Sequence, residues 1–282
     1  MGLIDFILNL AGLLLWLNWR AAKADPLGKP APATLIGTLR RAEPANASRW
    51  HLAAVLGGLL LLRALFYWQI GSAVAWAGKL DLGVTVLSFS STLSGPMLSL
   101  LRMVVFSLFS FALTLGIFYF WLLLLSILGG PMPTHRFVKI QLGRIDAWPR
   151  RVKLFLPLAV VALVWGLASW PLAWLQTIPQ PVSLARRLAE SLIIALGSYL
   201  VWKFLIAALL GLHLLNSYIY FGKNPFWNYV NATSNQLLRP LQNIPLRAGK
   251  ADFAPVAGIA LVFLLAGLAG RALVFIYGRL SL

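Results

Sequence analysis

Four charged residues stand within or beside long apolar stretches of this sequence and are the first candidates for chemistry: Arg63, Lys203, Glu190 and Arg271. A charge at the centre of a membrane costs about 2.5–3.5 kcal/mol on insertion scales, so such residues usually have a function or a partner. The functional interpretation is a path for anions or lipid headgroups, or a proton-coupled carrier. The structural interpretation, which we favour, is helix–helix packing or contact with the membrane interface.

Glu190 and Arg271 are expected to form an ion pair. They lie at similar predicted depth in two apolar runs, so the pair would join those runs. Glu190→Gln is therefore predicted to lower the melting temperature. Arg63 and Lys203 have no acidic residue at their predicted depth. A proton carrier normally requires a carboxylate within the membrane, and none lies in the middle of a predicted span.

Other kinds of chemistry find little support in the sequence. Cysteine is absent, which removes disulfides, thiolate metal sites, iron–sulfur clusters and covalent haem attachment. The histidines His51, His135 and His213 are far apart, and we expect His213 to be a hydrogen-bond donor between helices. No nucleophile–His–acid set and no Gly-rich phosphate loop occurs. We therefore expect a protein that is not an enzyme, with no catalytic residue, no metal and no cofactor.

The composition indicates a membrane protein. Of 282 residues, 60% are hydrophobic and 11% are charged, whereas soluble domains are about 45–50% apolar and about 25% charged. Several apolar runs reach the roughly 20 residues that a helix needs to cross a bilayer. Twelve Trp residues, often near the ends of these runs, are typical of interfacial aromatic belts. The predicted fold class is all-α integral membrane protein.

About six transmembrane helices are predicted, at residues 3–19, 52–71, 103–128, 154–175, 188–220 and 254–276. The first run is short and contains polar residues, so two alternatives stay open: it spans the membrane or lies at its surface. A weaker stretch at about 84–100 is expected to hold an interfacial helix that breaks at Gly95-Pro96.

The net charge of +17 is interpreted as a sign of topology. Sixteen of the 24 basic residues lie in three loops, 20–50, 130–153 and 222–253, which alternate with the spans. The positive-inside rule places such loops in the cytoplasm, with the N-terminus outside. We therefore expect a protein of the bacterial inner (cytoplasmic) membrane that attracts anionic lipids and binds no nucleic acid.

A punctuated loop occurs twice, each time between two apolar runs. Gln141-Leu142-Gly143-Arg144 precedes Pro149 and Pro157, and 95 residues later Gln236-Leu237-Leu238-Arg239 precedes Pro245 and Pro255. A repeat that carries helix, basic loop and helix together indicates an internal duplication. It predicts two parallel helix–loop–helix repeats.

The second loop has the pattern of a short amphipathic helix. Asn224 and Pro225 form a good helix start, because Asn caps free amides and Pro fits the first helical position. Apolar residues then recur at about 3.6-residue spacing, at Phe226, Val230, Leu237 and Leu241. Such a helix is expected to lie on the membrane surface.

The first loop shows the same pattern in degenerate form. Thr134 is the candidate cap, and Phe137, Ile140 and Ile145 supply part of an apolar stripe. Nothing in this copy matches Asp252 of the second loop. The basic residues Arg150, Arg151 and Lys153 stand there instead.

These features resemble the YggT family of small bacterial and plastid membrane proteins. The resemblance is carried by Asn224, Pro225, Leu237, Leu238, Arg239, Pro240, Pro245, Asp252 and Pro255, with Trp227 in the same loop. It is good over about 205–277, weaker over about 103–175 and absent from 1–101. It implies association with osmotic or ion stress, cell division or membrane-complex assembly, and no reaction.

The predicted organisation has three parts: an N-terminal membrane region at 1–101 with the basic linker 20–50, a degenerate repeat at 102–176 and a clearer repeat at 186–282. The predicted function is a membrane scaffold or assembly factor that acts through the cytoplasmic amphipathic loops. Its expected partners are anionic lipids, a membrane protein and further copies of the chain. The alternative is a small-ion channel or transporter that uses Arg63 and Lys203.

Overall fold

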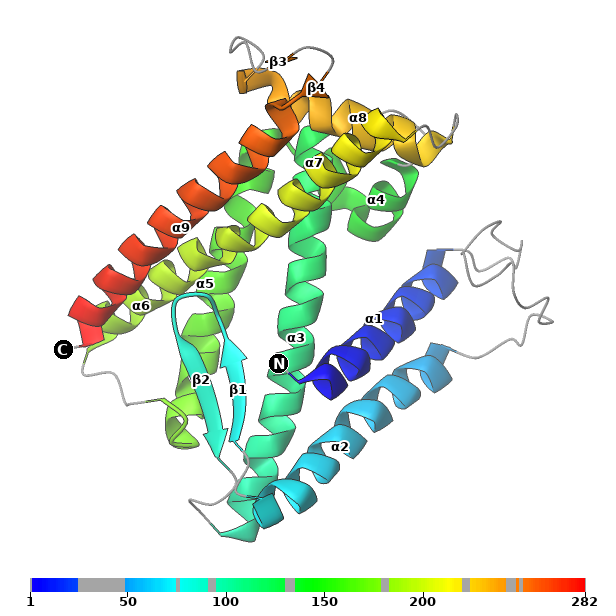
Figure 1. The fold of residues 1–282 in the computed structure, drawn as a ribbon. Helices are drawn as coiled ribbons and strands as arrows, with labels where there is room; N and C mark the ends of the chain where they lie inside the picture. Colours follow the sequence, from blue (N-terminus) through cyan, green and yellow to red (C-terminus); the bar gives the residue numbers. More distant parts are fainter. Residues whose placement is uncertain are drawn as a thin grey trace. The chain divides into compact units, whose positions relative to one another are not determined.

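The computed structural model describes residues 2–24, 49–74, 77–90, 95–129, 135–178, 183–219, 224–241, 247–248 and 251–281 (Figure 1). Most of linker 20–50, together with Thr134 and Pro245, lies outside these residues. The chain divides into two compact units. Unit 1 comprises residues 1–78 and 89–115, and unit 2 comprises residues 79–88 and 116–282.

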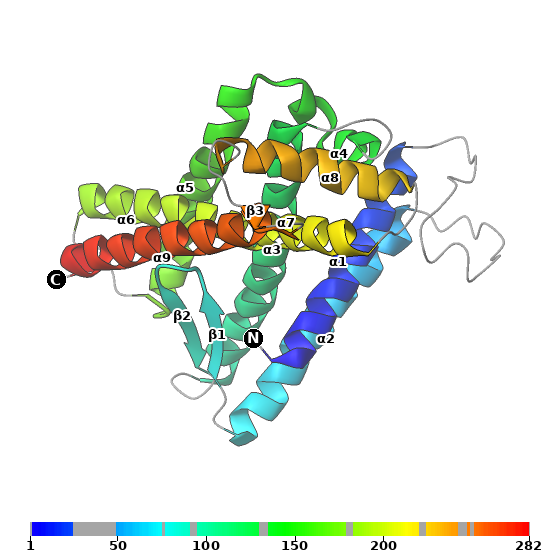
Figure 2. The ribbon, with the colours of Figure 1, turned by 45° about the horizontal axis from the view of Figure 1, so that its top comes forward.

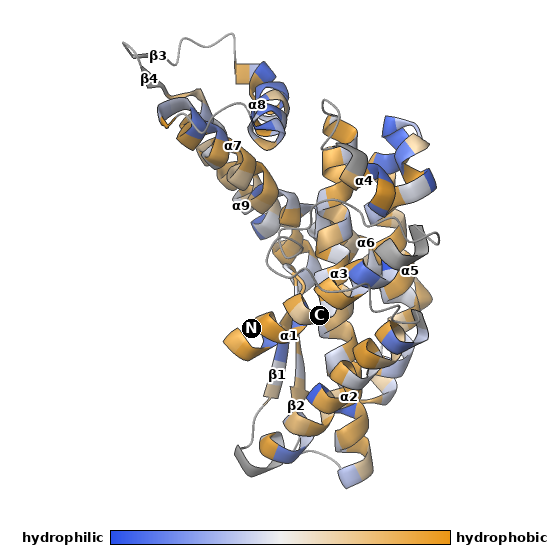
Figure 3. Cartoon of the chain, turned by 90° about the vertical axis from the view of Figure 1, so that its right-hand side faces the viewer, coloured by the Kyte–Doolittle hydropathy of each residue, from blue (hydrophilic) through white to orange (hydrophobic). Residues whose placement is uncertain are grey.

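Six helical stretches are long and apolar enough to cross a membrane, which indicates a membrane protein. They are Leu3–Arg20, Trp50–Gly71, Pro96–Leu128, Arg150–Trp174, Leu184–Tyr218 and Ala254–Arg279. They agree with the six predicted spans. Hydrophobic residues dominate these helices over most of their length (Figure 3).

Unit 1 is built on α1 (Leu3–Ala24), α2 (Arg49–Val74) and the first part of α3 (Pro96–Leu128). Helices α1 and α2 pack side by side (Figures 1 and 2). Their contacts run in opposite directions, because Asp5 meets Tyr67 while Gly12 lies near Leu56. Gly12 also permits close approach to α3, since a Cβ atom there would lie 2.9 Å from the Phe111 ring. The pair is therefore an antiparallel hairpin.

The prediction of an interfacial helix at about 84–100 is wrong. The structure has a β-hairpin, with strands β1 (Ala77–Asp81) and β2 (Val86–Ser90), and α3 begins directly at Pro96. In β2 the buried residues Leu87 and Phe89 alternate with exposed ones, which is the two-residue period of a strand. The turn is fixed by Asp81, whose carboxylate accepts a hydrogen bond of 2.7 Å from the backbone of Gly83.

Unit 2 contains most of the β1–β2 hairpin (residues 79–88) and the remaining elements. These are the second part of α3, α4 (His135–Leu142), η1 (Gly143–Ala147), α5 (Arg150–Trp174), α6 (Leu184–Gly197), η2 (Ser198–Val201), α7 (Trp202–Tyr218), α8 (Pro225–Leu238), η3 (Arg239–Leu241), β3 (Arg247–Ala248), β4 (Ala251–Asp252) and α9 (Ala254–Ser281). Helices α5 and α6 pack together, and α9 packs on α6 and α7. The short helices α4 and α8 lie at one end of these long helices (Figures 1 and 2).

Prolines and polar caps define several of the helix starts. Asn224 caps α8, with its side chain accepting from the Phe226 amide at 3.0 Å and Pro225 in the first turn, as the sequence predicts. Pro149 caps α5. Pro157 of the repeated pattern was expected to open this helix, and that prediction is wrong, because Pro157 lies inside it. Ser183 caps α6.

The order of long helix, short helix and long helix occurs twice, as α3–α4–α5 and as α6/α7–α8–α9. An origin by duplication stays a prediction. Helix α3 contributes to both compact units, whereas the predicted first repeat begins at residue 102. The predicted repeat borders follow the sequence pattern and the compact units follow the packing, so the two divisions of the chain differ.

Candidate functional site

A buried polar network joins the three helices of unit 1 around Arg63. The guanidinium donates from Nη2 to Asp5 Oδ1 at 2.8 Å and to Ser110 Oγ at 2.8 Å. It donates from Nη1 to Asn9 Oδ1 at 2.7 Å. The Tyr67 hydroxyl adds a bond of 2.6 Å to the same carboxylate oxygen of Asp5. The side chain of Arg63 is only 1% exposed, so its charge is neutralised inside the bundle.

The sequence prediction that Arg63 has no acidic partner is therefore wrong. Asp5 lies near the start of the predicted run 3–19, which either spans the membrane or lies at its surface. The sequence therefore does not fix whether Asp5 is at the same depth as Arg63. A usable signal existed in the spacing. Asp5 and Asn9 lie four residues apart on α1, as Arg63 and Tyr67 do on α2, so each pair shares one helix face.

The surroundings of the Arg63 guanidinium are partly aromatic. Its central carbon lies 5.4 Å from the Phe106 ring centre and 5.7 Å from that of Tyr67. The Nε atom is buried and has no hydrogen-bond partner among the described residues. Cation–π contact offsets part of the cost of burying a charge. This network holds helices together and offers no open cation to an ion pathway.

A second buried network joins α3, η1 and α5 in unit 2. Ser126 Oγ donates to Asp146 Oδ1 at 2.5 Å and accepts from Lys153 Nζ at 2.7 Å. Lys153 Nζ lies 3.8 Å from the same Asp146 oxygen. Lys153 was predicted as part of a basic loop, yet it is 5% exposed. The Ser126 hydroxyl thus bridges an ammonium and a carboxylate.

The distance from Ser126 to Lys153 equals that of a nucleophile and a base in hydrogen-bond contact. Two features favour a structural role. The Ser126 hydroxyl donates to Asp146, and the Lys153 Nζ donates to the Ser126 oxygen, so the lysine is not arranged to accept the serine proton. The arrangement is a bridge between the helices and the surface turn η1.

Polar contacts fix α8 on α7. His213 Nδ1 lies 2.8 Å from Asn231 Oδ1, as expected for a histidine that bonds between helices. Ser234 Oγ donates to the Leu209 carbonyl at 3.1 Å. Burial raises the pKa of the Tyr229 phenol, so this side chain stays neutral at physiological pH.

Helix α8 buries one face and exposes another. Val230 and Leu238 are buried, while Leu237 and Leu241 are half-buried and Phe226 is 45% exposed. The predicted single stripe is therefore only partly correct, because Phe226 stands apart from the buried face. Its ring stacks edge-on against Trp227, with ring centres 5.2 Å apart.

Helix α4 is arranged in a comparable way. Val138 and Leu142 are buried against Leu122 and Leu123 of α3. The predicted stripe residues Phe137 and Ile140 are instead exposed, and Ile145 packs partly against the cluster. The true buried face is thus shifted by one position from the prediction, a shift that an eight-residue helix allows because its pattern covers barely two turns.

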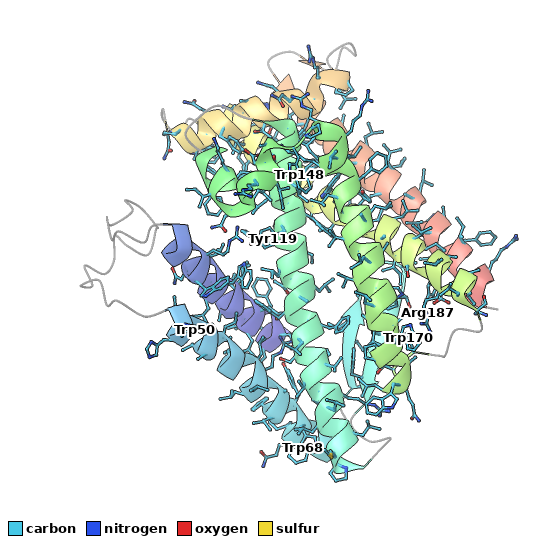
Figure 4. The ribbon with its side chains drawn as sticks, turned by 180° about the vertical axis from the view of Figure 1, so that it is seen from behind. Trp50, Trp68, Tyr119, Trp148, Trp170 and Arg187 are labelled. Carbon is cyan, nitrogen blue, oxygen red and sulfur yellow. The ribbon has the colours of Figure 1, made fainter. Side chains whose placement is uncertain are left out.

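Basic side chains are exposed around these two short helices. They are Lys139, Arg144, Arg150, Arg151 and Arg239, and we call this surface the basic end of unit 2. The described acidic side chain there, Asp146, is engaged by Ser126 and Lys153. Trp148 lies at this end, whereas Trp170 and Arg187 lie toward the other end of α5 (Figure 4). The basic end therefore combines exposed basic side chains with exposed apolar residues.

Lys203 lies over two aromatic rings. Its Nζ is 4.9 Å from the ring centre of Phe204 and 6.0 Å from that of Phe263 on α9. The residue is half-buried. This contact agrees with the structural interpretation of its charge, in which the lysine contributes to packing between α7 and α9.

The predicted ion pair between Glu190 and Arg271 is absent from the described structure. Glu190 pairs with Arg186 one turn earlier on α6, at 3.4 Å, and Arg271 is exposed. The spacing of four residues was the signal for this pair. Arg186 is one helical turn from Glu190 and is therefore a nearer partner than Arg271.

The stability effect expected of Glu190→Gln changes accordingly. A partly exposed pair at this spacing contributes about 0.3–0.5 kcal/mol, so the substitution should shift the melting temperature only slightly. Thermal unfolding of the purified protein checks this. A large loss of stability would show that Glu190 has a further partner.

The residues of the second loop occupy several elements. Asn224 and Pro225 start α8, Leu237 and Leu238 end it, and Arg239 and Pro240 form η3. Asp252 pairs with Arg247 in the β3–β4 ladder, and Pro255 lies in the first turn of α9. These residues shape the connection from α7 to α9 and are not gathered into one pocket by any described contact.

Comparisons with known proteins gave no match: no family model, no curated protein and no solved structure is similar to this chain. Within the described ranges, no three His, Cys, Asp or Glu side chains come together as metal ligands. The functional conclusion therefore depends on the surfaces and networks of the chain itself.

Proposed function

We propose that this protein is a non-enzymatic integral membrane scaffold or assembly factor that acts through the basic end of unit 2. The main support is the combination found there. Two short helices are each anchored by one buried face, while basic side chains and the rings of Phe137 and Phe226 stay uncovered. A rigidly held surface of this kind suits docking better than catalysis.

The proposed location is the bacterial inner membrane, with the basic loops in the cytoplasm. The support is the concentration of basic residues in loops that alternate with six apolar helices. The resemblance of Asn224-Pro225 and Leu237-Leu238-Arg239-Pro240 to the YggT family points the same way. In this arrangement α4 and α8 rest at the level of anionic headgroups.

The proposed partner is a membrane protein with an acidic cytoplasmic segment. Arg150 and Arg151 are both exposed in the first turn of α5, directly after the exposed Trp148. An acidic segment complements their charge, and aromatic residues beside arginine are typical of interface centres. Further copies of the chain are a weaker expectation, since they bring the same excess of positive charge.

Charge reversal at the basic end tests the proposal. Arg150→Glu with Arg151→Glu should reduce crosslinked recovery of the partner from native membranes by about ten-fold or more, because like charges then face the acidic segment. The readout is quantitative mass spectrometry after capture through a C-terminal tag. Lys79→Glu reverses an exposed charge of unit 2 on β1, outside the basic end, and should leave recovery unchanged.

Substitution of exposed aromatic residues complements charge reversal. Phe137→Ser with Phe226→Ser removes uncovered rings and spares the buried face. Leu238→Ser is unsuitable, because Leu238 is 5% exposed and its Cδ2 would lie 3.1 Å from a Cβ at Gly258. Equal recovery of the same protein by all variants, or recovery of this chain alone, would contradict the scaffold proposal.

Ion transport remains the alternative, and the contacts reduce its support. Arg63 is neutralised by Asp5, and Lys203 packs on Phe204 and Phe263. Both charges that motivated a pathway thus have partners within the chain. Ion flux in liposomes that Lys203→Leu abolishes, without loss of folding, would favour the alternative.

A further inference from the structure

Three arginines of unit 2 lie away from the basic end: Arg186 and Arg187 near the start of α6, and Arg279 in the last turn of α9. Arg186 pairs with Glu190, whereas Arg187 and Arg279 have no carboxylate partner among the described side chains. Helices α6 and α9 pack together, and the C-terminal end of α9 lies beside the start of α6 (Figures 1 and 2). We call this surface the arginine end of unit 2.

Aromatic rings hold two of these guanidinium groups. The Arg187 guanidinium lies 4.8 Å from the ring centre of Trp170 on α5 (Figure 4). Its Nε is buried without a hydrogen-bond partner in the described part of the chain. The Arg279 guanidinium lies 4.5 Å from the ring centre of Phe275. Stacking leaves the edges of a guanidinium available to an acceptor.

The described acidic side chains leave Arg187 and Arg279 without a carboxylate. The chain has seven acidic residues, and the three described in helices are engaged: Asp5 by Arg63, Asp146 by Lys153 and Glu190 by Arg186. Asp81 belongs to β1, and Asp252 lies at the other end of α9. A second copy would bring the same excess of positive charge, so an anionic molecule of another kind complements these arginines better.

We propose that the arginine end binds the phosphate groups of anionic membrane lipids. Arginine is suited to phosphate because its planar N–H groups donate in pairs. Trp170 is 69% exposed and Trp174 is 67% exposed at the end of α5, and exposed Trp at the end of an apolar helix is typical of the headgroup level. Among the described side chains, three guanidinium groups and one carboxylate, that of Glu190, lie here, so negatively charged headgroups complement the surface.

The test uses the full-length protein in liposomes with a phosphatidylglycerol probe that carries a photoreactive headgroup. Labelled peptides are identified by mass spectrometry, so each end of unit 2 is read separately. The α6 and α9 peptides of the wild type should be labelled, and Arg187→Gln with Arg279→Gln should reduce their labelling about ten-fold. Labelling of the α8 peptides should stay unchanged.

Controls separate the sources of phosphate. A phosphatidylcholine probe should label the arginine end weakly, and millimolar inorganic phosphate should not compete. Competition by inorganic phosphate would identify a free-anion site. Arg279→Gln alone, at the exposed last turn of α9, serves if the double variant does not fold. Equal labelling by both lipids, or labelling unaffected by the substitutions, would overturn the proposal and leave the scaffold function untouched.

Discussion

Asp5→Asn is expected to lower the free energy of unfolding by about 3–5 kcal/mol, because it leaves the buried Arg63 guanidinium without a counter-charge. The substituted amide keeps the size of the side chain and one acceptor oxygen. It therefore isolates the effect of charge. Thermal or chemical unfolding of the purified protein in detergent, followed by tryptophan fluorescence, measures the loss.

The double variant Asp5→Asn with Arg63→Met distinguishes a broken ion pair from general disruption. Replacing both members of a buried pair is often close to neutral, so most of the lost stability should return. Asp81→Asn, at the exposed last residue of β1, is the matched control, because the amide oxygen can still accept from Gly83, and it should change stability by no more than about 0.5 kcal/mol. A destabilisation of the double variant equal to that of Asp5→Asn would show that the two charges are not coupled.

Lys153→Met should produce the second large effect, a loss of about 3 kcal/mol. The methionine keeps the apolar length of the side chain but leaves Asp146 and Ser126 without the ammonium, in a site where the two charged side chains are 6% and 11% exposed. Arg150→Met removes the same charge three residues earlier, at an exposed position. That control should stay within about 0.5 kcal/mol.

A double-mutant cycle tests whether Ser126 transmits this interaction. Lys153→Met and Asp146→Asn should show a coupling energy of about 1–3 kcal/mol. In the Ser126→Ala background the coupling should fall, because the remaining distance between Lys153 Nζ and Asp146 is 3.8 Å without a bridging hydroxyl. Additive effects of the two substitutions would mean that the bridge makes no energetic contribution.

The six spans and the cap of α8 were predictable because they depend on local pattern. A run of about 20 apolar residues identifies a candidate span without reference to the rest of the chain. Asn224 followed by Pro225 is sufficient for a helix start. His213 was also predictable as a helix-to-helix contact, although Asn231 as its partner was not.

The ion pairs were not predictable in the same way, because pairing depends on the relative depth of helices. Asp5 meets Arg63 only because α1 packs antiparallel to α2 with Gly12 near Leu56. If the run 3–19 lies at the membrane surface, Asp5 is not at the depth of Arg63, so this alternative does not predict their pairing. Glu190 was assigned to Arg271 on depth, while Arg186 was one helical turn away.

The β-hairpin and the buried Lys153 illustrate a different difficulty. Residues 84–90 contain alternating apolar side chains, but the chain was apolar overall, so a helix was expected there. Lys153 was counted as a loop base because basic residues dominate its neighbourhood. Only the position of Ser126 and Asp146 across the bundle explains its burial.

The residues that form hydrogen bonds with α1 are synthesised much later than α1 itself. Arg63 follows Asp5 by 58 residues, and Ser110 follows Asn9 by 101. At about 5–20 residues per second, a ribosome needs roughly 3–12 seconds to reach Arg63 after Asp5. During that interval the carboxylate has no guanidinium to meet. Helix α1 can therefore complete its packing only after α2 and the first part of α3 have been synthesised, so it settles later than either of its own ends is made.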